Sequence, residues 1–289
     1  MLNPRHGKMF ERKGFTLIEL LVVIAVITLL MAILLPTFQR VKRQAKAVLC
    51  QSNLRQWGTM WAAYTQENDG YFPGGNPGEG RNSGPHHGPY IWWVREWGSE
   101  WNPGGMPGIR CCPMATKPVT EAGLEEFRGN MIGGTFLAWG KFPHPEYNSD
   151  IYGSYGINAW VYQPYRRDDA SYSYYWRNVN VRGASNIPVM LDNHRPWGYR
   201  YDFEDPPEFD AVPIALYRIS HDSGRYFCIN RHDGGVNGLF MDWSVRKVGL
   251  KEIWTLKWHR EFNTSNIWTK AGGVKPEDWA EWMRGFKDY

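Results

Sequence analysis

An apolar run close to the N-terminus, from Phe15 to Leu35, constrains this chain more than any other feature. It contains one charged residue, Glu19, and no helix breaker before Pro36. A helix over these residues would be about 30 Å long, which matches the hydrocarbon core of a bilayer. The run is apolar on all sides and has no polar face to offer to water. We therefore expect a helix that is inserted in a membrane.

Glu19 is the unusual residue of this run. A carboxylate in a membrane helix costs on the order of 2.5–3.5 kcal/mol at the bilayer centre and less near the interface. A charge that is retained there is expected to have a function and a positively charged partner. Taken without its neighbours, Glu19 is equally well explained as a glutamate that is tolerated at the membrane interface.

The neighbours of Glu19 favour a function. Residues 13–21 read KGFTLIELL, and this stretch closely resembles the cleavage and methylation signature of type IV prepilins and type II secretion pseudopilins. The resemblance implies that a prepilin peptidase cuts after Gly14 and that the new N-terminal residue, Phe15, is N-methylated. It also implies a partner for Glu19, the α-amino group of Phe15 in a neighbouring subunit, since paired opposite charges offset each other's desolvation cost. Pro36 matches the proline that the family has near the end of the run, where it must weaken or kink a helix.

The helical pattern continues beyond the proline. Leu54, Trp57, Trp61 and Tyr64 recur at spacings of three and four, which predicts an aromatic stripe on one helix face. Only Gly58 weakens this helix, by up to ~1 kcal/mol relative to alanine. We expect one continuous helix over residues 15–66, whose first part, 15–35, spans the membrane and whose second half packs on a globular head.

Residues 67–289 form the expected head, which begins at an Asn-Asp-Gly turn. The pattern predicts an α+β fold with an antiparallel β-sheet and long loops rich in glycine and proline. The sequence predicts strands at 134–139, 153–161, 188–192, 215–219 and 226–229, a hairpin at 238–248, and helical stretches at 121–128, 249–259 and 276–286.

Charge and compartment follow from the leader, residues 1–14. It carries a net charge of +3 out of a formal total of +4, so its removal leaves a nearly neutral protein. Because phosphate binding needs clustered positive charge, we do not expect a nucleic-acid partner. The prepilin resemblance implies a leader in the cytoplasm, a single pass through the bacterial inner membrane and a head outside the cytoplasm.

The four cysteines are Cys50, Cys111, Cys112 and Cys228. A head outside the cytoplasm places them in an oxidising space. No two form a C-x-x-C pair, and the adjacent Cys111 and Cys112 have poor spacing for zinc, so we do not expect a thiolate metal site. A disulfide from Cys50 to Cys111 or Cys112 would tie the helix to the head. Buried free thiols are the alternative, and the sequence leaves the pairing open.

Further landmarks resemble a large group of bacterial pilin-like proteins: residues 50–56, 64–73, 112–113 and 154–158. That group ends in a histidine, nine residues and Asp-Gly. His232 and Asp242 fit this spacing, but Trp243 replaces the glycine. If the glycine serves a turn with positive φ, the tryptophan puts the geometry of that turn in doubt.

Catalysis is not expected. His232 and Asp242 could form a catalytic pair, but no G-x-S-x-G or H-E-x-x-H motif accompanies them, so we interpret them as a polar pair that braces a hairpin. His86 and His87 are adjacent and cannot easily bind one metal, so we assign them to the surface.

Two further groups of residues leave ligand binding open. Five carboxylates crowd one loop: Asp202, Glu204, Asp205, Glu208 and Asp210. Oxygen ligands suit Ca²⁺, and major pseudopilins are known for a calcium site in the head, although a solvated acidic loop is the simpler interpretation because no EF-hand spacing is present. The second group contains Trp92, Trp93, Trp97 and Trp101. One interpretation is that these rings pack together and hold a loop in place, and the other is that they stack on sugars or on another subunit.

Together these observations predict a structural pilin-like subunit, not an enzyme. It would be processed, N-methylated and assembled with other pilin or pseudopilin subunits into a filament in the periplasm or at the cell surface. The competing hypothesis is a membrane-tethered head that binds glycans or catalyses a reaction and uses the same export signal.

Overall fold

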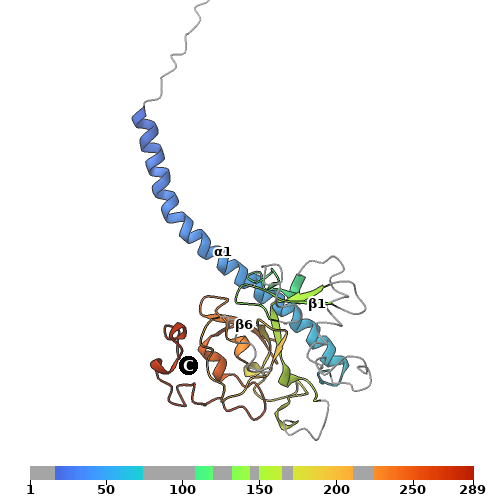
Figure 1. Cartoon of the computed structure of the whole chain (residues 1–289). Helices are drawn as coiled ribbons and strands as arrows, with labels where there is room; N and C mark the ends of the chain where they lie inside the picture. The colour runs from blue at the N-terminus through green and yellow to red at the C-terminus, as the bar shows by residue number, and fades with distance from the viewer. Residues whose placement is uncertain (1–16, 74–107, 120–131, 144–149, 165–171, 211–223) are drawn as a thin grey trace, which may run out of the picture. The chain divides into compact units, whose positions relative to one another are not determined.

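The computed structural model describes residues 17–73, 108–119, 132–143, 150–164, 172–210 and 224–289 (Figure 1). The chain divides into two compact units, residues 1–44 and 45–289. Helix α1, Leu17–Glu67, contributes to both units. This helix and the mixed β-sheet of the second unit confirm the predicted α+β architecture.

In the first unit, α1 is apolar and uncovered. The large hydrophobic side chains between Leu17 and Leu35 are 45–79% exposed. The most apolar stretch of 18 residues in this helix has a mean hydropathy of 3.0, and none of its residues is buried. The helix continues through Pro36, and the Thr37 hydroxyl donates to the Ile33 carbonyl one turn earlier. By length and composition, this is a helix that can cross a membrane.

In the second unit, α1 packs one face against the head. Cys50, Leu54, Trp57 and Trp61 are at most 1% exposed, and their spacings of four, three and four place them on one side of the helix. This confirms the predicted stripe at Leu54, Trp57 and Trp61. Each buried indole removes roughly 150–250 Å² from water, so the stripe is a large share of the contact.

The end of α1 is a glycine cap. Gly70 has a φ of 82°, and its N–H donates to the Thr65 carbonyl at 2.7 Å. Glycine adopts this left-handed conformation without a steric penalty and satisfies a carbonyl that the helix leaves unpaired. The helix therefore ends at the predicted turn.

The head contains a five-stranded sheet in the order β5-β3-β4-β6-β7. All neighbouring strands are antiparallel except β3 and β5, which are parallel. The strands are β3 Tyr155–Asn158, β4 Pro188–Asp192, β5 Trp197–Gly198, β6 Gly235–Phe240 and β7 Val245–Gly249. A separate antiparallel pair is formed by β1 Trp139–Pro143 and β2 Asp150–Gly153. The predicted hairpin is thus present as β6 and β7.

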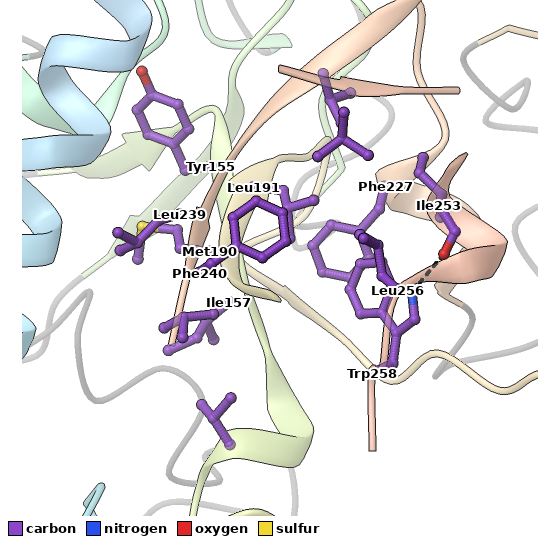
Figure 2. Packing of buried hydrophobic residues seen from close by; sticks show 14 of the residues in the cluster. Tyr155, Ile157, Met190, Leu191, Phe227, Leu239, Phe240, Ile253, Leu256 and Trp258 are labelled. Atoms are coloured by element: carbon purple, nitrogen blue, oxygen red, sulfur yellow. Dashed lines mark hydrogen bonds between the residues drawn. The ribbon is translucent and has the colours of Figure 1, made fainter. Parts of the chain in front are cut away.

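The core joins the central strands to the C-terminal segment. Figure 2 shows Ile157, Met190 and Leu239 of β3, β4 and β6 in the same cluster as Phe227 and Trp258. The Trp258 indole N–H donates to the Ile253 carbonyl at 2.8 Å, the dashed line in Figure 2. Because this hydrogen bond pairs the indole N–H, the Trp258 ring is buried without an unpaired donor.

Several predicted elements take another form. The predicted strand at 226–229 overlaps a 3₁₀ turn, η9 Gly224–Phe227. The predicted C-terminal helices are short 3₁₀ turns, η10 Lys251–Thr255, η11 Pro276–Asp278 and η12 Glu281–Met283. Trp254 and Trp279 are 0% and 1% exposed, so packing of the large rings decides the backbone here rather than local propensity. The predicted elements at 121–128 and 215–219 lie outside the described residues.

Candidate functional site

Four side chains with metal-binding atoms meet inside the head: Cys50, Cys112, Asp192 and His232. One ligand atom from each lies within 4.8 Å of the others, and all four residues are buried. Over the parts of the chain that the structure describes, no other group of three or more cysteine, histidine and acidic residues converges in this way. The residues come from α1, a loop, the end of β4 and the segment before β6, and they are far apart in sequence.

Local backbone contacts fix these positions. Cys112 follows the short turn η2, Gly108–Arg110, and its N–H donates to the Ser154 hydroxyl at 2.6 Å. Asp192 is the last residue of β4. The His232 N–H donates to the Gly235 carbonyl at 2.9 Å, which holds the histidine in a tight turn at the start of β6.

The contacts within the cluster are short. The Cys50 Sγ atom lies 3.6 Å from each carboxylate oxygen of Asp192. The Cys112 Sγ atom lies 3.4 Å from Nε2 of His232. The same Nε2 lies 3.1 Å from Oδ2 of Asp192. The imidazole nitrogen therefore faces both a sulfur and a carboxylate.

A shell of donors surrounds these groups. The Arg231 guanidinium lies 3.0 Å from Oδ1 of Asp192, and both side chains are fully buried. The Asn237 N–H donates to Oδ2 of Asp192 at 2.8 Å, and the Tyr155 hydroxyl donates to Cys50 Sγ at 3.3 Å. A buried carboxylate is stable only when charge and hydrogen bonds compensate its lost hydration, and Asp192 has both.

This environment shifts the pKa values of the cluster. Burial would raise the pKa of Asp192, but the charges of His232 and Arg231 outweigh burial and lower it to about 2. Burial opposes the charged form of His232, yet Asp192 raises the pKa of His232 to about 9. Burial likewise opposes the Cys112 thiolate, but hydrogen bonds from Cys50 and His232 together with the charge of Arg231 outweigh burial and lower the pKa of Cys112 to about 7. Burial, by contrast, raises the pKa of Cys50 well above its ordinary value. Without an ion the surroundings therefore favour an ionised Asp192 beside a protonated His232 and keep Cys50 as a thiol.

The geometry differs from that of a cysteine–histidine–aspartate catalytic triad. In a triad, one imidazole nitrogen faces the nucleophile and the other faces the carboxylate. Here Cys112 and Asp192 both contact Nε2 of His232. Cys112 is also 0% exposed, whereas a nucleophile must be reached by a substrate. Convergence on one nitrogen instead suits four ligands around a single central ion.

The structure does not pair His232 with Asp242. The two residues lie at opposite ends of β6, and His232 contacts Asp192 instead. Oδ1 of Asp242 accepts hydrogen bonds from the Ser244 N–H at 3.0 Å and the Ser244 hydroxyl at 2.6 Å. Asp242 therefore stabilises the turn between β6 and β7. Trp243 sits in that turn with a φ of 65°, so the left-handed conformation is present without a glycine.

The cysteines are all free and buried, and the structure contains neither of the disulfides considered for Cys50. Cys50 and Cys112 nevertheless meet in the cluster, whereas Cys111 does not join it. The Cys228 sulfur contacts the Met283 sulfur at 4.0 Å. The expectation that no thiolates gather at a metal site rested on local spacing, and the fold brings two thiols together from distant positions.

The five acidic residues considered for calcium are not brought together as a ligand group. Asp210 accepts from the Thr135 hydroxyl and from the Asn230 N–H, both at 2.9 Å. Glu204 lies 3.2 Å from Arg200, and Asp202 accepts from the Asn263 N–H. Asp205 and Glu208 are exposed. These carboxylates are used separately within the loop, which favours the simpler interpretation.

Other predicted site residues lie outside the described residues: Gly14, Phe15, His86, His87, Trp92, Trp93, Trp97 and Trp101. The glycan-binding hypothesis depended on the four tryptophans, so it gains no support here. Glu19 and Pro36 lie within α1, in the first unit. Glu19 is in the first turn of the described helix, among exposed apolar neighbours.

One family model matches the N-terminal part of the chain. Residues 9–35 match the family described as the prokaryotic N-terminal methylation motif. The chain carries a prepilin-type signature. Over 69 residues the chain is 36% identical to the type IV major pilin protein PilA of Myxococcus xanthus (strain DK1622). The matched residues make up 24% of this chain and 29% of the length of that relative. No solved structure matches. Both matches support a type IV pilin-like protein with a membrane-anchoring helix.

Proposed function

We propose that this protein is a structural, non-catalytic pilin-like subunit that assembles with other pilin or pseudopilin subunits into a filament. The observation that carries the proposal is the methylation motif at residues 9–35, whose described part, residues 17–35, is helical and has large apolar side chains that are 45–79% exposed. In this proposal a prepilin peptidase cuts after Gly14, and Phe15 becomes the methylated N-terminus.

The exposed apolar surface supports assembly. Contiguous apolar patches of this extent are covered by a membrane or by other protein in the cell. A bilayer covers the helix before assembly, and packing against the helices of neighbouring subunits covers it afterwards. If each subunit contacts the next through a different surface, the contact repeats along an axis and gives a helical filament.

The proposed setting is a type II secretion pseudopilus or a type IV pilus-like system. The prepilin-type signature supports an orientation with the leader in the cytoplasm and the head outside the inner membrane. Long segments beyond the matched region favour a minor or specialised subunit over a compact major one.

Glu19 gives the test of assembly. Glu19→Gln keeps the size of the side chain and removes its charge, whereas Glu19→Asp keeps the charge. We expect the glutamine variant to enter the membrane and to be processed normally, but to be lost from sheared and sedimented filaments. We expect the aspartate variant to be retained, because it preserves attraction to a neighbour's α-amino group. Normal incorporation of Glu19→Gln into filaments would contradict the proposal.

A further inference from the structure

We propose that Cys50, Cys112, Asp192 and His232 bind one zinc ion inside the head. The proposal is independent of filament assembly, because all four ligands belong to the unit formed by residues 45–289. Cysteine sulfur, histidine nitrogen and carboxylate oxygen are the three ligand types that proteins use for Zn²⁺. Four protein ligands without an open position are typical of a structural site rather than a catalytic one.

Three of the ligand-to-ligand distances are close to the edges of a zinc tetrahedron, and all four ligand atoms lie within 4.8 Å of one another. With Zn–S bonds of about 2.3 Å and Zn–N or Zn–O bonds of about 2.0–2.1 Å, a sulfur and a nitrogen or oxygen ligand lie about 3.6 Å apart, and a nitrogen and an oxygen about 3.3 Å apart. The sulfur of Cys50 lies 3.6 Å from the Asp192 oxygens, and that of Cys112 lies 3.4 Å from His232. The His232 and Asp192 ligand atoms lie 3.1 Å apart.

The charges also balance. Two thiolates and one carboxylate carry three negative charges, and a divalent ion leaves one of them uncompensated. Arg231, which is fully buried and 3.0 Å from Asp192, supplies the remaining positive charge. His232 then acts as a neutral ligand. The two thiols and any imidazolium lose their protons to solvent when the ion binds, so binding releases protons.

The surrounding shell is of the kind that orients metal ligands. Arg231 and the Asn237 N–H hold the Asp192 carboxylate from two sides, and the Tyr155 hydroxyl donates to the Cys50 sulfur. Hydrogen bonds from a second layer fix ligand orientation and tune affinity at metal sites. A zinc ion bound to these ligands ties the C-terminal half of α1 to β4, to the loop at Cys112 and to the segment before β6.

A disulfide between Cys50 and Cys112 is the main competitor, because it would consume two of the ligands. A metal-free hydrogen-bonded cluster is the second competitor, since the same distances suit thiol hydrogen bonds. The three possibilities differ in metal content and in the oxidation state of the two sulfurs, and both can be measured on the full chain.

The experiment uses the full-length protein, extracted in detergent without chelator or added reductant. We expect about one zinc per chain by elemental analysis, as a closed four-ligand site requires. We also expect Cys50 and Cys112 to react with an alkylating reagent only after a strong chelator is added. Replacement of zinc by Co²⁺ should produce the visible absorption of a tetrahedral thiolate site.

Cys111→Ser is the matched control, because Cys111 is adjacent to Cys112 and equally buried but lies outside the cluster. It should retain zinc and the cobalt absorption, whereas Cys112→Ser should lose both. If Cys112→Ser does not fold, the metal content and the chelator-dependent alkylation of the wild-type chain still decide the matter. A Cys50–Cys112 disulfide, a wild-type chain that binds no metal when zinc is supplied, or equal loss of zinc in Cys111→Ser would overturn the proposal.

Discussion

At the scale of single residues, Trp243 occupies a backbone conformation that side chains other than glycine rarely adopt. Its φ of 65° lies in the left-handed region, where a Cβ atom comes too close to the following carbonyl oxygen. The ring is half-buried, and its centroid lies 6.4 Å from that of Phe72. Packing of the ring thus offsets part of the backbone strain at this turn.

Two substitutions separate these effects at Trp243. Both Trp243→Gly and Trp243→Ala remove the ring, so both should destabilise the head. The glycine variant should be more stable than the alanine variant by roughly 1–2 kcal/mol, because only alanine retains the left-handed penalty. Chemical unfolding followed by tryptophan fluorescence measures the difference.

The neighbouring residue Ser244 is the control for this comparison. It is exposed and does not have a positive φ, so Ser244→Ala should be at least as stable as Ser244→Gly. An alanine variant of Trp243 that equals or exceeds the glycine variant in stability would show that the turn is not strained there.

The cluster shows which part of a site can be predicted residue by residue. His232 could be singled out by its spacing from Asp242, yet its partner is Asp192, which no motif marks. The sequence shows that Cys50 and Cys112 are cysteines, but with 61 residues between them it does not show that they lie close together. Contacts of this kind depend on how α1 and the sheet pack, and that information is not local to any stretch of sequence.

At the scale of elements, the contact of α1 with the sheet depends on Gly58. The sequence alone marks Gly58 as a weak point of the helix. In the structure it is buried, and a Cβ atom added there would lie 2.9 Å from Cδ1 of Leu239 on β6. The glycine therefore allows the helix to approach the sheet closely, which compensates for its poor helix propensity.

The effect of Gly58→Ala on the free energy of unfolding should consequently depend on the side chain at position 239. Alanine gains up to about 1 kcal/mol of helix propensity, but overpacking against a buried side chain costs roughly 1–3 kcal/mol. We expect a net loss of stability in the wild-type background and a gain in the Leu239→Val background, which lacks the offending Cδ1 atom. Unfolding free energies of the two single variants and the double variant give the coupling.

Thr59→Ala provides the control for this cycle, since Thr59 is the next residue of α1 and is exposed. Its effect should add to that of Leu239→Val within about 0.5 kcal/mol, as for independent sites. Additive behaviour of Gly58→Ala and Leu239→Val would mean that the close approach is not a constraint.

Elements with a strong periodic signal were the predictable ones. The helix was expected at 15–66 and is described at Leu17–Glu67, and β4 matches the predicted strand at 188–192. The C-terminal segment was not predictable, because Trp254 and Trp258 fit a helical spacing and are both buried, yet only the short 3₁₀ turn η10 forms there in place of a helix. In this segment tertiary packing determines the backbone conformation, and the spacing of hydrophobic residues in the sequence does not reveal it.

At the scale of the whole molecule, the two units have different requirements. Residues 45–289 bury a core of their own, fastened in our proposal by a zinc ion. The apolar helix in residues 1–44 leaves its large side chains exposed and needs a membrane or neighbouring helices to cover them. Residues 17–35 of the methylation motif lie on this helix, and the motif connects the physical requirement to a known route of processing and assembly.

Intact-mass analysis of the chain recovered from its native host tests this central claim most directly. The account predicts a mature protein that begins at Phe15, lacks residues 1–14 and carries one added methyl group on its N-terminal nitrogen. A Gly14→Leu variant should keep the leader, because the bulky side chain replaces the glycine at the cleavage position. Wild-type protein that retains residues 1–14 and bears no methyl group would contradict the account.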